Sequence, residues 1–303
     1  MKRLEDKVIL VTGSGRGFGR AMAYAYALEG AKVVTVSRTV SELKSLENNI
    51  LAKGGEVLTL PTDLMDVDSI NRMKEEVLET YGRLDVLVNN AATSPWNTIE
   101  ETTLETWERV IAVNLTAPFL LSKAFFESMK EQGKGSIINV TSRSAEIGFV
   151  AEAAYCPSKY GIEGLTQCQA LEWQPHNIAA NTLGVGAPPG LRLKPTELTL
   201  EEASQMPEEV RKLYADDDSM AEAFSEAWSF LALQDAQGIT GQRFSTRTLA
   251  EYLRRNGWEA AVANWTRKLT KAVYVSYDFP ESARYQTPEG GFKELKYNFD
   301  KDK

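Results

Sequence analysis

The sequence predicts a doubly wound α/β fold, with one parallel sheet of about seven strands and helices on both faces. Short β-rich runs alternate with longer helical patterns over residues 1–245. The runs are almost continuously apolar, which is typical of strands that are covered on both faces of a parallel sheet. No linker interrupts the alternation, so these residues are expected to form one domain.

The first half of the pattern contains three strand–helix pairs and a fourth strand. The pairs are Val8–Thr12 with Phe18–Glu29, Lys32–Ser37 with Val40–Lys53, and Val57–Leu60 with Ser69–Tyr81, followed by a strand at Leu84–Asn89. The second half predicts a helix within Leu104–Lys130, a strand at Ser136–Val140, a helix at Tyr155–Trp173, a strand at Ile178–Leu183, a helix at Met220–Leu233 and a strand at Gln242–Phe244. Ligands of such sheets bind beyond the carboxyl ends of the strands, so candidate site residues should follow the strands.

Two segments depart from the alternation. Residues 187–219 contain four prolines and clustered glutamates, and we expect them to form a mobile cover over a substrate site. Residues 246–303 form a C-terminal extension with a possible helix at Thr248–Leu269, a β-like run at Ala272–Phe279, and an end rich in Gly, Lys and Asp that is expected to fray. The extension is too aromatic for plain disorder, so we expect it to pack on its own subunit or on a neighbour.

The composition favours a cytoplasmic enzyme. The 303 residues are 43% hydrophobic and 25% charged, and the net charge of −8 argues against nucleic acid or an anionic membrane as the partner. The apolar run near the N-terminus is too short for a signal peptide, and no stretch approaches the roughly 18 apolar residues of a membrane span. Two cysteines and a single histidine, His176, predict a reduced protein without a metal site.

A glycine-rich turn joins the first strand to the first helix. Gly13, Gly17 and Gly19 lie where a dinucleotide site requires a tight turn and close approach of the backbone to a pyrophosphate. A flexible turn is the alternative explanation for the glycines taken alone. The candidate cofactor-binding residues of this turn are Gly13, Ser14, Arg16, Gly17, Phe18 and Gly19.

The end of the second strand predicts which nicotinamide cofactor is used. An acidic residue there accepts the ribose hydroxyl of NAD, whereas an arginine accommodates the 2′-phosphate of NADP. This chain has Ser37 and Arg38 at that position, and Arg16 lies in the glycine turn. The pattern therefore predicts NADP(H) over NAD(H). The alternatives are that Arg38 is a solvated turn residue and that the protein is an NAD-dependent secondary-alcohol dehydrogenase.

The glycine turn, Asn89-Asn90-Ala91, Ser142 and the pair Tyr155 and Lys159 together resemble the short-chain dehydrogenase/reductase family over about Asp6 to Phe244. The resemblance implies a Rossmann-like domain that oxidises or reduces a carbonyl or secondary alcohol with a nicotinamide cofactor. It further implies a catalytic tetrad of Asn114, Ser142, Tyr155 and Lys159, and nucleotide contacts from Asp63, Leu64, Asn90 and Ala91. It also implies a homodimer or homotetramer built on the helices around Thr106–Lys130 and Tyr155–Trp173.

Three positions depart from the family pattern. Ala92 stands where the family usually has glycine, and Val185-Gly186 replaces the usual Pro-Gly after the sixth strand. We nevertheless include Ala92, Val185 and Gly186 among the cofactor-binding residues. Pro157 lies between Tyr155 and Lys159, which is compatible with a helix only if the helix begins there.

Helical spacing would place Tyr155 and Lys159 on one face, with the ammonium near the phenol. Lowering a phenol pKa from about 10 to about 7 requires roughly 4 kcal/mol, which the ammonium and the oxidised nicotinamide could supply together. In reduction, Ser142 would hold the carbonyl oxygen and Tyr155 would deliver the proton. Lys159 would also hold the nicotinamide ribose, and Asn114 would organise a water. The alternative of another class is a non-catalytic NADP-binding sensor or scaffold.

The substrate is expected to lie among loops that follow the strand ends, together with the 187–219 cover. The candidate residues are Ser94, Trp96, Ser144 and Phe149. Trp96 and Phe149 suggest an apolar or ring-bearing ketone or alcohol, and packing is the alternative role for both.

Overall fold

The computed structural model describes residues 2–194, 198–271, 280–287 and 291–297. Its centre is a seven-stranded parallel sheet with the strand order β3-β2-β1-β4-β5-β6-β7. The strands are β1 (Val8–Thr12), β2 (Lys32–Ser37), β3 (Glu56–Pro61), β4 (Val86–Asn89), β5 (Gly135–Thr141), β6 (Ile178–Gly184) and β7 (Arg243–Ser245). The predicted doubly wound fold is confirmed.

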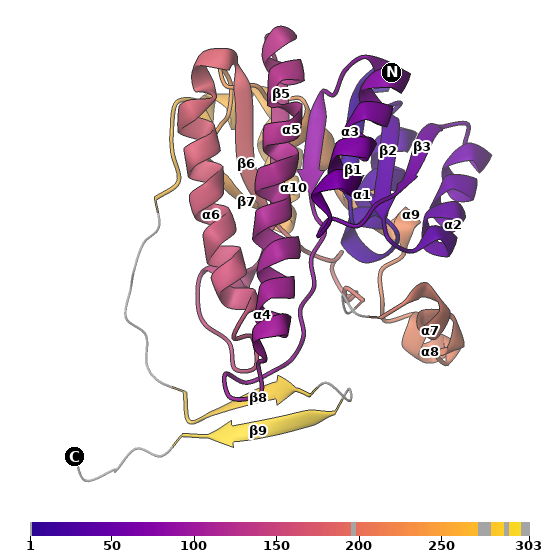
Figure 1. The fold of residues 1–303 in the computed structure, drawn as a ribbon. Helices are drawn as coiled ribbons and strands as arrows, with labels where there is room; N and C mark the ends of the chain where they lie inside the picture. The colour runs from indigo at the N-terminus through magenta and orange to yellow at the C-terminus, as the bar shows by residue number, and fades with distance from the viewer. Residues whose placement is uncertain (1, 195–197, 272–279, 288–290, 298–303) are drawn as a thin grey trace.

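Helices cover both faces of this sheet (Figure 1). They include α1 (Gly17–Leu28), α2 (Val40–Ala52), α3 (Val67–Tyr81), α4 (Leu104–Ile111), α5 (Ala117–Glu131), α6 (Tyr155–Glu172) and α9 (Asp217–Ala232). Helices α1 and α9 share one core with one face of the sheet, and α3 and α5 share the other. Successive residues of β1 alternate between the two, since Ile9 and Val11 join the first core and Val8 and Leu10 the second.

The strand order reverses between β1 and β4, which opens a crevice at their carboxyl ends. The glycine turn after β1 and the Asn-Asn-Ala segment after β4 meet at this point. Strand β1 pairs in parallel with both β2 and β4, so the ends of all three strands lie at one edge. The fold thus brings together segments that are far apart in the sequence.

Two helices differ from the prediction in detail. The helix expected within Leu104–Lys130 is divided into α4 and α5 by one π-helical turn, η1 (Ala112–Thr116). Helix α6 begins at Tyr155, so Pro157 falls in its first turn, where its missing N–H would have no intrahelical partner in any case. The helix therefore begins where the presence of Pro157 requires it to begin.

The 187–219 segment folds into two short helices, α7 (Leu200–Gln205) and α8 (Glu208–Arg211), which lie apart from the sheet layers in Figure 1. Backbone hydrogen bonds between Arg192 and residues 213 and 215 tie the two ends of the segment together. Thr199 and Glu202 form a capping box at the start of α7. The segment is thus built from local hydrogen bonds.

The C-terminal region adds helix α10 (Thr246–Trp265) and an antiparallel pair, β8 (Ser282–Gln286) and β9 (Phe292–Lys296). Helix α10 is broken at Gly257, where φ is +77°. The expected fraying is wrong for residues 292–296, because they pair with β8. The predicted β-like run Ala272–Phe279 lies outside the described residues. The division at residue 245 stays a prediction.

One helical stretch in the described part of the chain, Leu104–Glu131, is long and apolar enough to cross a membrane by length and composition, since an 18-residue window within it has a mean hydropathy of 1.3. It consists of α4, η1 and α5. Its residues Leu121, Phe125 and Met129 are buried in the core that α5 shares with the sheet. Core helices pass the same test of length and composition. The absence of a membrane partner stays a prediction.

Candidate active site

A cavity of about 270 Å³ opens at the crevice between the ends of β1 and β4. Most of the predicted cofactor-binding residues line it: Gly13, Arg16, Gly17, Phe18, Gly19, Ser37, Arg38, Asp63, Leu64, Asn90, Ala91, Ala92, Tyr155, Lys159 and Val185. The cavity also has lining residues that the sequence analysis did not select, among them Glu42, Thr62, Arg109, Val113 and Lys194. Its position and its glycine-rich wall fit a dinucleotide.

The glycine turn is held against the end of β4. Gly13 has a φ of +64°, and a Cβ there would lie 2.8 Å from the Cα of Ala91. The Asn90 amide group donates to the carbonyl of Thr12 at 2.9 Å, and the Thr12 hydroxyl accepts from the backbone N–H of Asn90 at 3.0 Å. A side chain at Gly19 would collide with that amide group. The glycines therefore serve a fixed, close-packed turn.

Two of the predicted cofactor residues do not line the cavity. The Ser14 hydroxyl is buried and accepts from the backbone N–H of Val36 at 2.9 Å, which joins the glycine turn to β2. Gly186 lies beneath Arg247, since a Cβ at Gly186 would meet the Cγ of Arg247 at 3.0 Å. Ser14 thus supports the glycine turn, and Gly186 packs against the side chain of Arg247.

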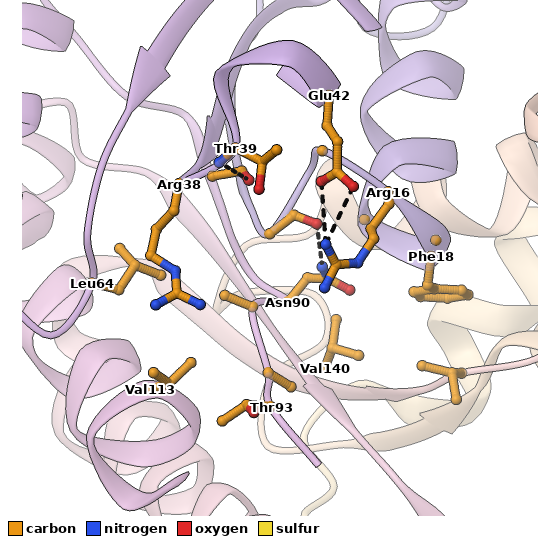
Figure 2. Close-up of a pocket in the computed structure, with 18 of the residues that line it drawn as sticks. Arg16, Phe18, Arg38, Thr39, Glu42, Leu64, Asn90, Thr93, Val113 and Val140 are labelled. Atoms are coloured by element: carbon orange, nitrogen blue, oxygen red, sulfur yellow. Dashed lines mark hydrogen bonds and ion pairs between the residues drawn. The ribbon is translucent and has the colours of Figure 1, made fainter. Parts of the chain in front are cut away.

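Two arginines and an acid gather at the end of β2. Arg16 and Glu42 point toward each other, and Arg38 reaches in from the other side (Figure 2). The Arg16 Nη1 lies 3.2 Å from the Glu42 Oε1. The two cations fit a site for a phosphate monoester. Sequence reasoning missed Glu42, although it follows Arg38 by one helical turn in the first turn of α2.

Tyr155 and Lys159 lie one turn apart at the start of α6, as predicted. The Lys159 Nζ lies 5.5 Å from the centre of the Tyr155 ring and donates to the carbonyl of Val140 at 2.9 Å. Burial raises the pKa of Tyr155 to about 12, and a hydrogen bond with Ser142 partly opposes this. Burial also lowers the pKa of Lys159 to about 8. Burial is therefore the largest influence on the pKa of this phenol.

Ser142 lies at the end of β5, next to Tyr155. Its hydroxyl accepts from the backbone N–H of Ser144 at 3.2 Å, so it caps a short helical turn. Its hydrogen bond with Tyr155 nevertheless places the same hydroxyl beside the phenol. Ser142 thus combines the capping role with a position at the candidate centre.

Asn114 lies in the π-helical turn and does not line the cavity. Its side-chain amide donates to the carbonyl of Thr93 at 3.0 Å and to the Ser158 hydroxyl at 3.1 Å, and its Oδ1 accepts from the backbone N–H of Thr93 at 2.9 Å. These bonds use both N–H groups of the amide and one of the two lone pairs of its oxygen. Asn114 therefore joins the segment after β4 to the first turn of α6.

A partly buried ion pair supports this centre, and sequence reasoning missed it. Glu163, one turn after Lys159 on α6, accepts from the hydroxyls of Thr141 at 2.5 Å and Thr182 at 3.0 Å. It also pairs with Arg243 of β7 at 3.0 Å. Arg243 in turn donates to the backbone carbonyl of Ser142 at 2.9 Å. The pair therefore fixes α6 and Ser142 relative to the strand ends.

None of the four predicted substrate residues, Ser94, Trp96, Ser144 and Phe149, lines the cavity. The Ser144 hydroxyl donates to the buried carboxylate of Glu152 at 2.6 Å. Phe149 is 39% exposed and lies against Arg143, with the guanidinium carbon 5.9 Å from the ring centre. Their roles toward a substrate stay a prediction.

The cover segment contributes to the cavity on the side of the glycine turn. Its residues Leu193, Lys194, Leu198 and Leu200 line the wall, and the backbone N–H of Leu200 donates to Glu42 at 3.4 Å. These contacts place the segment beside Arg16 and Glu42. Within the described ranges, no group of three His, Cys, Asp or Glu side chains gathers that could hold a metal.

Comparison with known proteins agrees with this geometry. The family model for short chain dehydrogenases matches residues 7–189. The chain is 34% identical over 181 residues to D-threitol dehydrogenase from Mycolicibacterium smegmatis, covering 60% of this chain and 70% of that protein. It is 36% identical over 191 residues to trans-4-hydroxycyclohexanecarboxylate dehydrogenase from Sinomonas cyclohexanicum. This match covers 61% of this chain and 73% of that protein.

A solved structure of a short-chain oxidoreductase is similar to most of this chain. A metagenomic short-chain oxidoreductase in complex with NADP superposes with a TM-score of 0.65 at 31% identity, covering 80% of this chain and 98% of that chain. The matched family, the parallel sheet and the position of the cavity at the glycine turn agree with one another. The chain is therefore a member of the short-chain dehydrogenase family and an NAD(P)-dependent oxidoreductase.

Proposed function

We propose that this protein reduces a ring-bearing or otherwise apolar ketone to a secondary alcohol with NADPH, and that Tyr155 donates the proton. The observation that carries the proposal is the presence of Tyr155 and Lys159 on the same cavity wall as the glycine turn. A proton donor and a site for a hydride donor thus face one space. The reverse oxidation of the alcohol would use the same residues.

Each residue of the centre has a distinct task in this proposal. The Ser142 hydroxyl holds the carbonyl oxygen, and Tyr155 delivers a proton to that oxygen as the alkoxide forms. Lys159 favours the phenolate that remains and binds the nicotinamide ribose. Asn114 keeps the segment after β4 and the start of α6 in register, and helps to organise a water. The nicotinamide, when bound, supplies the hydride and a positive charge in its oxidised form.

The positive charge is needed because the lysine alone leaves the Tyr155 pKa high. Burial raises that pKa to about 12. A cation next to the phenol would lower it, because an opposite charge within about 4–6 Å favours the ionised form. We infer that the phenol becomes a useful acid and base only when the nucleotide site is filled.

The preference for NADP(H) rests on Arg16 and Arg38. Arg38 is exposed at the end of β2 and, within the described part of the chain, makes no hydrogen bond or ion pair. It is therefore available to a 2′-phosphate. The similar metagenomic oxidoreductase was solved with NADP, which supports the same choice.

The substrate class is supported by one relative and opposed by another. One similar dehydrogenase is named for a hydroxycyclohexane carboxylate, and another for threitol. The ring-bearing class rests on the hydroxycyclohexane relative and on Trp96 and Phe149, two partly exposed aromatic residues in the loops that follow β4 and β5.

The proposal is tested by following NADPH consumption with a panel of cyclic ketones, open-chain ketones and sugars. We expect turnover with cyclic ketones, and a kcat/KM at least about tenfold higher with NADPH than with NADH. Comparable kcat/KM values for the two cofactors would contradict the cofactor assignment, and preference for sugars would contradict the substrate class. Nucleotide binding without turnover on any member would contradict the reaction itself.

Glu152 is expected to shift the pH dependence of turnover. Its carboxylate is buried, lies one turn before Tyr155, and raises the pKa of the phenol. Reduction requires the protonated phenol, so activity falls as pH rises through the pKa of Tyr155 in the working complex. Replacing Glu152 with glutamine removes the negative charge and should move this falling limb to lower pH. Oxidation requires the phenolate, so its activity rises as pH passes the pKa of Tyr155. This rise should also move to lower pH in the variant.

The measurement is kcat against pH in both directions for the wild type and Glu152→Gln. Glu172→Gln, which removes an exposed carboxylate from the other end of α6, is the matched control and should leave both limbs in place. Limbs that stay in place for Glu152→Gln, or that move to higher pH, would contradict the assigned role of this charge.

We further propose a homodimer or homotetramer in the cytoplasm. Large apolar side chains are exposed on the helices that the sequence analysis selected for assembly: Trp107, Phe119 and Leu171 are 39%, 48% and 60% exposed. Exposed apolar side chains on these helices favour their use as contact surfaces between copies. Light scattering of the full chain should give the mass of two or four copies, and the mass of one copy would contradict the proposal.

A further inference from the structure

Glu42 is a buried carboxylate on the wall of the cofactor cavity. Only 5% of the residue is exposed, although it lies in the first turn of α2. A Cβ placed on Gly15 would lie 2.8 Å from the Glu42 Oε2 and 3.0 Å from the Ser37 Oγ. The carboxylate therefore lies between the glycine turn and the end of β2, next to Gly15 and Ser37.

The carboxylate is bound to the cation that the cofactor proposal requires. The Arg16 Nη1 lies 3.2 Å from Oε1 and 3.4 Å from Oε2, so one guanidinium nitrogen spans both oxygens. The Arg16 side chain is 29% exposed and that of Glu42 6%, so solvent screens the pair only in part. Figure 2 shows this pair on the cavity wall, with Arg38 approaching from the opposite side.

A 2′-phosphate and Glu42 would compete for Arg16. A phosphate monoester carries a charge of about −1.5 to −2 at neutral pH and would lie near a carboxylate that already occupies the guanidinium. The 2′-hydroxyl of NAD, in contrast, is a hydrogen-bond donor, for which a carboxylate oxygen is a suitable acceptor. The same side chain thus disfavours one cofactor and is compatible with the other.

We propose that Glu42 determines how strongly the protein discriminates between NADP and NAD, by competing with the 2′-phosphate for Arg16. The proposal rests on the proposed function, because it assumes that a nicotinamide dinucleotide fills this cavity. Arg38 and Arg16 attract the phosphate, and Glu42 limits that attraction. The preference for NADP(H) is accordingly weaker than two arginines alone would produce.

The test is the affinity of Glu42→Gln for the two reduced cofactors, measured by fluorescence titration. Glutamine has nearly the same shape and keeps an acceptor for Arg16 and for the backbone N–H of Leu200. We expect NADPH to bind about tenfold more tightly than to the wild type, and NADH to bind within about twofold or more weakly. Equal changes for both cofactors, or weaker binding of NADPH, would overturn the proposal.

Two further variants separate this mechanism from a general effect of charge. Glu47→Gln removes one negative charge from the same helix at a partly exposed pair with Lys44, and should change neither affinity by more than about twofold. In an Arg16→Ala background, the gain from Glu42→Gln should shrink to about threefold or less, since the contested cation is gone. A tenfold gain that persists there would show that Glu42 does not act through Arg16.

The outcome for the wild type distinguishes the two proposals. If the wild type binds neither NADPH nor NADH, the proposed function fails and this inference fails with it. If the wild type binds and uses NADPH but Glu42→Gln does not change the ratio of the two affinities, only the role of Glu42 is rejected.

Discussion

Replacing Tyr155 with phenylalanine is expected to lower kcat by about 10²- to 10⁴-fold while leaving the Kd for NADPH within about threefold of the wild type. The substitution removes one hydroxyl from a side chain in the first turn of α6. That hydroxyl is the only proton donor assigned to the carbonyl oxygen, so turnover should depend on it. The glycine turn and both arginines remain, so the nucleotide should still bind. Steady-state rates and fluorescence titration measure the two effects separately.

Tyr160 provides a matched control for this experiment. It lies on the same helix, is 40% exposed and does not line the cavity. Tyr160→Phe should keep kcat within about twofold of the wild type. Near-normal turnover by Tyr155→Phe would reject Tyr155 as the acid, and a large loss of NADPH affinity would show that the phenol mainly supports the nucleotide site.

Replacing Lys159 with methionine is expected to remove most turnover without lowering stability at pH 7. The ammonium is the cation nearest to the Tyr155 ring, so its loss should reduce kcat by about 10²-fold or more and weaken NADPH binding. The same ammonium is buried, which lowers its pKa from 10.5 to about 8. Burial thus disfavours the charged form that the proposed chemistry uses.

The sign of the stability effect follows from that pKa. The unfolded chain binds more protons than the folded one between pH 8 and 10.5, so the free energy of unfolding should rise with pH in this window. At pH 7 the lysine is charged in both states, and the shift of 2.5 from 10.5 to 8 corresponds to a cost of about 3 kcal/mol. Methionine removes this cost but leaves the Val140 carbonyl without its donor, which costs about 1–3 kcal/mol.

Denaturant unfolding between pH 7 and 10 measures this balance. The Lys159→Met variant should be at least as stable as the wild type at pH 7, and its stability should rise less between pH 8 and 10. Exposed Lys53, at the end of α2, supplies the control, since Lys53→Met should leave the pH dependence unchanged. A Lys159→Met variant that loses several kcal/mol at pH 7 would show that the buried ammonium stabilises the fold.

The sequence predicted the features that depend on local pattern. Each of the seven strands of the parallel sheet was predicted, and the central ones were marked by apolar runs, because a strand covered on both faces has little choice of residue type. The glycine turn was also predictable, since Gly13 requires a positive φ and Gly19 must leave room for Asn90. Tyr155 and Lys159 could be paired from their spacing alone.

Features that depend on distant contacts were not predictable. Glu42 meets Arg16 only because α2 packs beside the glycine turn, and Arg243 meets Glu163 only because β7 pairs with β6. The position of the cover segment beside Glu42 likewise depends on one contact from Leu200. The spacing of Tyr155 and Lys159 likewise does not reveal how strongly burial raises the pKa of Tyr155, because burial depends on contacts from other elements.

Helix α10 has a practical consequence for shortening the protein. Its residues Leu249, Ala250, Leu253 and Ala261 belong to the core that α1 and α9 share with the sheet. A chain cut after residue 245 would leave that hydrophobic surface open to water and should aggregate. A cut after residue 271 would keep α10 and remove only what lies beyond it. Deletion studies of the C-terminal extension should therefore begin with the cut after residue 271. Aggregation caused by the exposed core is then not mistaken for the loss of a contact between subunits.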